Sequence, residues 1–123
     1  MQLAEAEYFS LATFRRNGNA VATPVWFAAS GDTYYVFSAP DTGKIKRIRL
    51  TSRARVAACD IRGKLLGEWI DAKARLVADA AEIERAYGQL RRKYGFRIAT
   101  LDFFAKLTGR FQRRQFIAVT LAP

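Results

Sequence analysis

The chain has 123 residues, of which 50% are hydrophobic and 13% aromatic, and its formal net charge is +10. This composition argues against disorder and predicts a single domain over residues 1–123 with a buried core. The sequence contains no histidine and one cysteine, Cys59, which excludes an internal disulfide, a zinc site and a Ser-His or Cys-His nucleophile, so an enzyme of this composition needs a cofactor for its chemistry.

Three strands joined by two turns are predicted at the start of the chain. Residues 8–15 form the first strand, Asn17-Gly18 is a strong hairpin signal, and residues 20–29 form the return strand. Pro24 cannot donate a backbone hydrogen bond, so we expect the second strand to be an edge, or to carry a bulge, at that point. Residues 33–38 are apolar on both faces, which predicts a third strand that is covered on both sides.

A short cationic helix is predicted over residues 44–50, directly after the turn at residues 40–43. Ile45 and Ile48 give it an apolar face. The unpaired amides of a helix N-terminus and the helix dipole both favour an anion, and Lys44 adds a positive charge there. The segment therefore predicts an anion site suited to a phosphate, and the alternative is a solvated basic turn.

The second half of the chain contains the remaining strands and two helices. Strands are predicted over 55–60 and 66–77, and the even-numbered residues of the longer one are apolar from position 70 to 76, which predicts one face in the core. An amphipathic helix follows from Asp79 to Gly95, a second helix over 100–108, and a last strand over 114–121. The order predicts a mainly β domain built as a six-stranded antiparallel barrel.

The positive charge has two local concentrations. Residues 44–55 hold six basic groups and no acid, and residues 91–114 hold eight basic groups against Asp102 alone. Such a surface attracts anions, so a small barrel that binds nucleic acid is one alternative. The basic residues do not alternate with aromatic residues on an identifiable strand face, which argues against nucleic acid as the partner.

No membrane-spanning segment is predicted, because the longest uncharged run covers only residues 17–31 and contains several polar residues. The acidic N-terminal sequence has no basic region followed by an apolar stretch, so no signal peptide is visible. A single cysteine fits a reducing compartment. Together these features predict a cytoplasmic protein.

Seven short segments, in a fixed order and spacing over roughly residues 8–77, resemble those of a known family. They are Leu-Ala-Thr-Phe (11–14), Asn-Gly-Asn (17–19), Ala-Thr-Pro-Val-Trp-Phe (22–27), Tyr-Val-Phe-Ser (35–38), Thr-Gly-Lys-Ile-Lys-Arg-Ile-Arg (42–49), Arg-Val-Ala-Ala-Cys-Asp (55–60) and Leu-Gly-Glu-Trp-Ile-Asp-Ala-Lys-Ala-Arg-Leu (66–76). The chain resembles the pyridoxamine 5′-phosphate oxidase-like, FMN-binding split-barrel proteins, and looks closest to the short members that use the deazaflavin coenzyme F420.

The resemblance implies a split barrel and a homodimer with a cofactor in a groove at each subunit interface. On the phosphate side, Lys44 matches the basic residue that holds the cofactor phosphate. Thr42 and Gly43 match the loop around the phosphate, and Ser38 matches a polar contact at the end of a strand. Arg47 is a further candidate contact on the same helix.

On the ring side, Thr23, Pro24 and Trp26 match the strand beside the flavin or deazaflavin ring, and Trp69 matches a residue that faces the partner subunit's site. The implied function is an oxidoreductase that transfers a hydride between F420 and a small organic substrate, and an FMN-binding reductase of the same fold is the alternative. The resemblance assigns no catalytic residue and no metal site.

The chain departs from the pyridoxamine oxidases themselves at two places. Those enzymes usually carry an arginine and a lysine, five residues apart, on the second strand to hold the FMN phosphate, whereas this chain has Ala22 and Phe27 at about those positions. They also use basic residues in a C-terminal segment for the substrate, whereas this sequence ends in Leu-Ala-Pro. Oxidation of pyridoxamine phosphate is therefore not expected.

Overall fold

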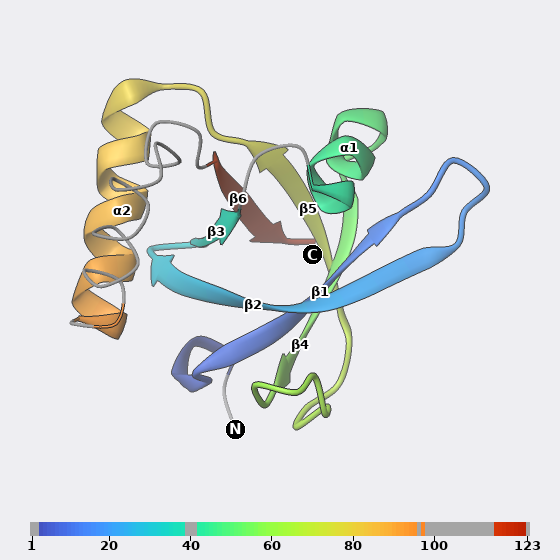
Figure 1. The fold of residues 1–123 in the computed structure, drawn as a ribbon, viewed down its shortest axis with the longest axis horizontal. Coiled ribbons are helices and arrows are strands. Elements are labelled where there is room, and N and C mark those ends of the chain that lie inside the picture. Colours follow the sequence, from blue (N-terminus) through green and yellow to red (C-terminus); the bar gives the residue numbers. More distant parts are fainter. Residues whose placement is uncertain (1–2, 39–41, 96, 98–114, 123) are drawn as a thin grey trace.

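Six antiparallel strands form a closed barrel in the computed structural model, which describes residues 3–38, 42–95, 97 and 115–122 (Figure 1). The strands follow each other around the barrel in the order β1-β2-β3-β6-β5-β4, and β4 pairs with β1 to close it. The elements are the 3-10 helix Leu3–Glu5, β1 (Tyr8–Phe14), β2 (Ala20–Ser30), β3 (Thr33–Ser38), α1 (Gly43–Leu50), β4 (Arg53–Cys59), β5 (Ile70–Leu76), α2 (Ala80–Tyr94) and β6 (Gln115–Leu121).

The predicted barrel and the helix after the third strand are confirmed. Apart from the fifth strand, the predicted strands and the first two helices agree with the structure to within two residues at their ends. The helix predicted over residues 100–108 lies outside the described residues. The 3-10 turn at Leu3–Glu5 has no counterpart in the prediction.

The fifth strand is shorter than predicted, because the chain forms a turn after β4 and pairs with the end of β4 before β5 begins. Asp60 closes that turn by accepting two backbone N–H groups, two and four residues later, at 2.9 Å each. The chain then returns along β4, and the Leu66 N–H donates to the Ala58 carbonyl at 2.7 Å. β5 therefore begins at Ile70, and Trp69 lies in the connecting loop and not on the strand.

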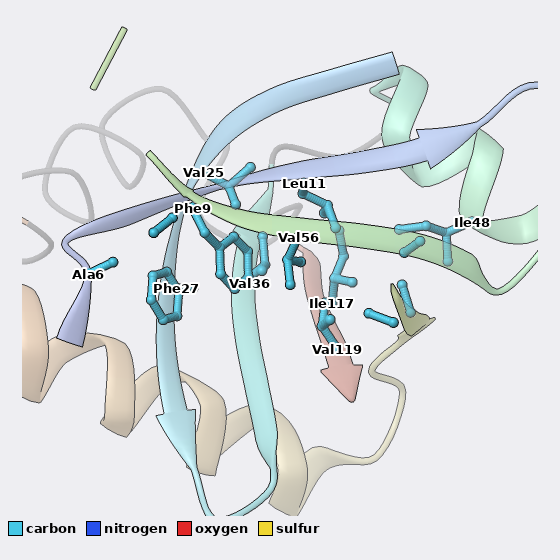
Figure 2. Close-up of a cluster of buried hydrophobic side chains, with 14 of the residues drawn as sticks. Ala6, Phe9, Leu11, Val25, Phe27, Val36, Ile48, Val56, Ile117 and Val119 are labelled. Atoms are coloured by element: carbon cyan, nitrogen blue, oxygen red, sulfur yellow. The ribbon is translucent and has the colours of Figure 1, made fainter. Parts of the chain in front are cut away.

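The interior of the barrel is filled by one apolar cluster, to which all six strands and α1 contribute (Figure 2). Phe9 and Phe27 stack with their ring centroids 4.1 Å apart. Ile45 and Ile48 of α1 are buried in the same cluster, as their spacing predicted. Lys93 contacts the Phe27 ring, with its Nζ 3.4 Å from the centroid, and burial lowers the pKa of this amine to about 8.

Helix α2 covers the outer face of β2 and β3. Its buried side chains pack against those of the strands in a second apolar cluster, outside the barrel. Its N-terminus is capped by Asp79, whose carboxylate accepts the Glu82 N–H at 3.0 Å. The Glu82 carboxylate binds Arg75 through two short contacts and accepts the Tyr35 hydroxyl at 2.8 Å. This neighbourhood lowers the pKa of Glu82 to about 2, chiefly through Arg75. The third strand is thus covered on both faces, with Tyr35 outside and Val36 inside.

The last residue of α2, Tyr94, ties the helix to the barrel at one point. Its hydroxyl accepts the Phe27 N–H at 2.9 Å and lies 2.6 Å from the Glu7 carbonyl and 2.9 Å from the Phe27 carbonyl. In the register of β1 with β2, Glu7 and Phe27 would be the next pair after Tyr8 and Trp26. The hydroxyl therefore replaces the backbone hydrogen bonds that this pair would form with each other. It satisfies backbone groups that would otherwise be buried without partners.

Replacing Tyr94 by phenylalanine should lower the free energy of unfolding by about 1–3 kcal/mol, because it leaves the Phe27 N–H buried without a partner. Urea unfolding at neutral pH measures this difference. Tyr87→Phe, on the same helix, is the matched control, because the Tyr87 hydroxyl has a 3.5 Å contact with the exposed Arg91. Equal losses in the two variants would contradict the bridging role of Tyr94.

Candidate functional site

The barrel is split where β2 changes its neighbour. Residues 20–26 of β2 pair with β1 alone, and residues 27–30 pair with β3 alone. Over residues 20–26, before Phe27, the edge of β2 that faces away from β1 has no strand partner among the described residues. Pro24 lies in this segment, opposite Ser10 in an unbroken register, so the edge expected at Pro24 is confirmed and there is no bulge.

Helix α1 begins close to this split, directly after the end of β3. The Thr42 carbonyl accepts the Lys46 N–H at 3.2 Å, but the Thr42 side chain does not cap the helix. Its hydroxyl instead lies 3.2 Å from the Ser38 hydroxyl at the end of β3. The first amides of α1 are thus not capped by the residue that usually caps them, which suits an external acceptor.

Arg47 reaches back from the next turn of α1 over Gly43. Its Nε donates to the Thr13 hydroxyl at 2.6 Å, which fixes the guanidinium on β1. A Cβ atom added to Gly43 would lie 2.6 Å from the Arg47 Nη1 atom. Only glycine leaves room for the guanidinium in this position. The packing of Arg47 therefore accounts for the glycine at position 43, without any requirement on the backbone angles.

Lys44 and Arg47 at this helix repel each other, and neither has an acidic partner among the described residues. Burial lowers the pKa of Lys44, and the charge of Arg47 lowers it further. Burial likewise lowers the pKa of Arg47, with a smaller effect from Arg15. The ion pairs of the described residues lie elsewhere, at Arg55–Asp71, Arg75–Glu82 and Arg97–Glu7. Half-buried like charges without a counter-ion are the electrostatic condition of an anion site.

The cationic surface continues past Arg15 into a groove beside the turn of the β1–β2 hairpin. The groove has a volume of about 350 Å³, and no acidic side chain is among its lining residues, which are Phe14, Arg15, Arg16, Gly18, Leu50, Thr51 and Arg53. The Arg53 guanidinium lies 4.0 Å from the centroid of the Phe14 ring. An anion that approaches the helix therefore meets an attractive field over a wide area.

Two buried oxygen atoms on the inner face of the barrel lack hydrogen-bond partners among the described residues. One is the Oγ1 atom of Thr23, a residue that the sequence already indicated, and the other is the Oε1 atom of Gln115. Sequence analysis missed Gln115. Its position, two residues before Ile117 on a strand that alternates inward and outward, could have identified it as a polar residue that faces the core.

The structure brings together only part of the predicted site. Ser38, Thr42, Gly43, Lys44 and Arg47 lie around the N-terminus of α1. Thr23 points into the barrel, whereas Trp26 points outward, since successive side chains of a strand alternate.

The remaining candidates lie farther from α1. The Trp26 ring stacks on Tyr94 of α2, with centroids 4.8 Å apart. Pro24 is exposed on the outer side of β2. Trp69 is 39% exposed in the loop between β4 and β5, directly before β5.

Comparison with known sequences identifies the family. The profile of the pyridoxamine 5′-phosphate oxidase family matches residues 2–122. The chain belongs to this family. No curated protein matches the sequence significantly.

Solved structures share the fold at low sequence identity. The heme storage protein HutZ from Vibrio cholerae is 14% identical, with a TM-score of 0.72 over 97% of this chain and 84% of its own. The conserved hypothetical protein Rv2991 from Mycobacterium tuberculosis is 14% identical, with a TM-score of 0.73 over 98% and 76%. A FAD-binding protein from Mesorhizobium loti is 18% identical, with a TM-score of 0.63 over 98% and 83%.

Two other kinds of feature are absent from the part of the chain that the structure describes. None of its helices is long and apolar enough to cross a membrane. Nor do three or more histidine, cysteine, aspartate or glutamate side chains gather there in a way that could hold a metal ion. The proposed function therefore rests on the residues around the N-terminus of α1.

Gly43→Ala should change the stability of the protein by less than about 1 kcal/mol, because the better helix propensity of alanine opposes the strain on the hydrogen bond between Arg47 and Thr13. It should also weaken anion binding severalfold, because the new Cβ displaces the Arg47 guanidinium. The measurement is the rise in melting temperature on addition of inorganic phosphate. Gly88→Ala on α2 is the control, since a Cβ there has nothing within 4 Å. A full phosphate response in Gly43→Ala would contradict the role given to Arg47.

Proposed function

We propose that this protein is an oxidoreductase that binds coenzyme F420, with FMN as the alternative cofactor, and that it transfers a hydride between the cofactor and a small organic substrate. The observation that carries the proposal is the pair of cations at the N-terminus of α1, beside the split between β2 and β3, which has no acidic partner among the described residues. A family match over residues 2–122 and a FAD-binding structural neighbour support a flavin-type ligand.

The residues at α1 fit the phosphate group of such a cofactor. Lys44 and Arg47 offer only hydrogen-bond donors, the first amides of α1 add backbone donors, and Gly43 leaves the approach open. The cofactor, when bound, supplies the electrons and the hydride. The protein's own residues hold its phosphate, and the filled barrel beneath them keeps water away from that side of the site.

The second strand favours F420 over FMN. Phe27, at about the place of the family's strand lysine, is fully buried against Phe9 in the barrel core, and Ala22 offers no charge. The two strand cations that usually hold the FMN phosphate are thus replaced by residues that cannot bind it. This leaves Lys44 and Arg47 as the main phosphate contacts.

The heme storage neighbour suggests a different ligand, but this chain is poorly suited to it. Haem iron is commonly held by a histidine, and less often by cysteine, methionine or tyrosine. The sequence has no histidine, and its one cysteine is buried. We therefore keep a flavin or deazaflavin as the proposed ligand.

The test of the proposal is a side-by-side titration with F420 and FMN, in which we expect F420 to bind more tightly. Lys44→Ala should weaken cofactor binding about 10–100-fold, because a charge-assisted phosphate contact contributes about 1.5–3 kcal/mol. Lys46→Ala, exposed on the same helix, is the matched control and should bind like the wild type.

Two outcomes would count against different parts of this proposal. If the wild-type protein binds neither cofactor, the proposed function is wrong. If Lys44→Ala binds the cofactor within about 1 kcal/mol of the wild type, the function stands but the phosphate site lies elsewhere.

We also propose that the protein acts as a homodimer in which the loop between β4 and β5 meets the second copy. This loop carries most of the large apolar side chains that the described residues expose, namely Ile61, Leu65, Leu66 and Trp69. Exposed apolar groups concentrated in one segment are typical of an interaction surface. Sedimentation velocity should give a dimer for the wild type and a shift towards monomer for Trp69→Lys. A monomeric wild type would contradict this assembly.

A further inference from the structure

Two grooves meet at the C-terminal end of α1 and form one surface. The first is the groove of about 350 Å³ beside the turn of the β1–β2 hairpin. The second has a volume of about 300 Å³ and lies against β4 and β5. Thr51 and Arg53 line both grooves, so the surface runs without a break from the hairpin turn past α1 to β4 and β5 (Figure 1). We call it the basic face, after its members Arg15, Arg16, Leu50, Thr51, Arg53, Arg55 and Lys73.

The charge of the basic face is almost entirely positive. Lys73 is the direct partner of Arg53 in the register of β4 with β5, and like charges opposite each other on a sheet are destabilising. Asp71 is the one acid that lines either groove, and it is paired with Arg55 at 2.9 Å. The other cations of the face have no acidic partner among the described residues. The face therefore attracts a partner that carries several negative charges.

An apolar side chain is exposed in the middle of these cations. Leu50 is the last residue of α1, lines the first groove and is 54% exposed. Ile45 and Ile48 attach α1 to the barrel core. Because each residue of an α-helix turns by about 100°, position 50 lies about 140° from position 45 and about 160° from position 48. The Leu50 side chain therefore points away from the barrel, into the charged surface.

The chemistry of the face distinguishes between two kinds of anionic partner. A single strand of nucleic acid offers phosphates to the arginines, but it also stacks its bases on aromatic rings. The one aromatic residue that lines the grooves is Phe14, which is 5% exposed and lies under the Arg53 guanidinium at 4.0 Å. A bilayer that contains anionic lipids offers a layer of negative charge with an apolar layer beneath it. These two layers match arginines that surround an exposed leucine.

We propose that the basic face binds the surface of an anionic lipid membrane, with Leu50 at the boundary between headgroups and acyl chains and the arginines among the headgroups. Such binding is peripheral and reversible, because one apolar side chain and a few charges bind far more weakly than a spanning helix. The inference does not rest on the proposed function. Lys44 lies at the other end of α1 from Leu50 and lines neither groove.

The experiment is sedimentation of the full chain with vesicles of phosphatidylcholine, with or without phosphatidylserine as about a third of the lipid, in about 0.1 M salt. We expect binding only to the vesicles that contain phosphatidylserine, and weaker binding as the salt concentration rises, because salt screens the attraction. The double variant Arg15→Gln with Arg16→Gln should bind about 25-fold more weakly, since each basic residue near an anionic membrane contributes about a fivefold increase in affinity.

The matched control for charge is the double variant Arg91→Gln with Arg92→Gln. It removes the same two charges from exposed positions on α2, which lies on the left of the barrel in Figure 1 while α1 lies on the right. Its binding should stay within about twofold of the wild type, because charges more than a Debye length from the membrane are screened. Equal losses in the two double variants would show that only the total charge matters and would overturn the inference.

The test of the apolar contact leaves the charge unchanged. Leu50→Ser should weaken binding to the phosphatidylserine vesicles about fivefold, because it removes an apolar side chain from the membrane boundary. Leu50→Trp should strengthen it, because tryptophan favours that boundary, and the fluorescence of the added indole should shift to shorter wavelength when the vesicles are added. Neither variant should change the binding of a single-stranded oligonucleotide.

The remaining outcomes are decisive as well. If the wild type does not sediment with phosphatidylserine vesicles, the inference is wrong. It is also wrong if Leu50→Ser binds them as tightly as the wild type, and tighter binding of the oligonucleotide than of the vesicles would then assign the face to nucleic acid. Lys44→Ala should keep its vesicle binding while it loses cofactor affinity, so a failure of the proposed function and a failure of this inference are separate results.

Discussion

The exchange of neighbours along β2 is the constraint on which the site depends. The strand pairs with β1 up to Trp26 and with β3 from Phe27 onward, so no part of it lies between two strands. The Tyr94 hydroxyl stands at the point of exchange and binds backbone groups of Phe27 and Glu7. Without that hydroxyl, the end of the β1–β2 ladder would be buried with unpaired groups. The same exchange opens the split in which we place the ligand.

The positive charges at the split repel each other as long as no anion is bound. Lys44 and Arg47 are half-buried and close to each other, and the acids of the described residues are paired or exposed elsewhere. Glu82 shows the opposite arrangement on the far side of the barrel, where two short contacts with Arg75 hold the helix to the sheet. The cluster at Glu82 is satisfied and structural, whereas the cluster at α1 has no counter-ion among the described residues, as expected for the anion site that we propose.

Much of the candidate site could be predicted from the sequence because it is local in the chain. Thr42, Gly43, Lys44 and Arg47 lie within six residues, so a strand, a turn and a cationic helix were enough to indicate them. Thr13, which binds Arg47, and Gln115, the strand partner of Ser38, come from the first and last strands. Thr13 lies in one of the segments that resemble the family, but its contact with α1 was not predicted, and Gln115 lies outside those segments. Trp26 was predicted beside the ring, but the structure stacks it on Tyr94, a contact between residues far apart in the chain.

The sequence by itself determined the element order and the inward faces of the strands, and it indicated where we propose the anion site, because alternation, turn residues and helix spacing act over a few neighbouring residues. The tertiary structure decided where β5 begins, which strand takes each edge of β2, and which polar side chains remain without a partner inside the barrel. Those features depend on competition among distant segments for the same backbone edges and the same interior volume, and local spacing does not encode the result of that competition.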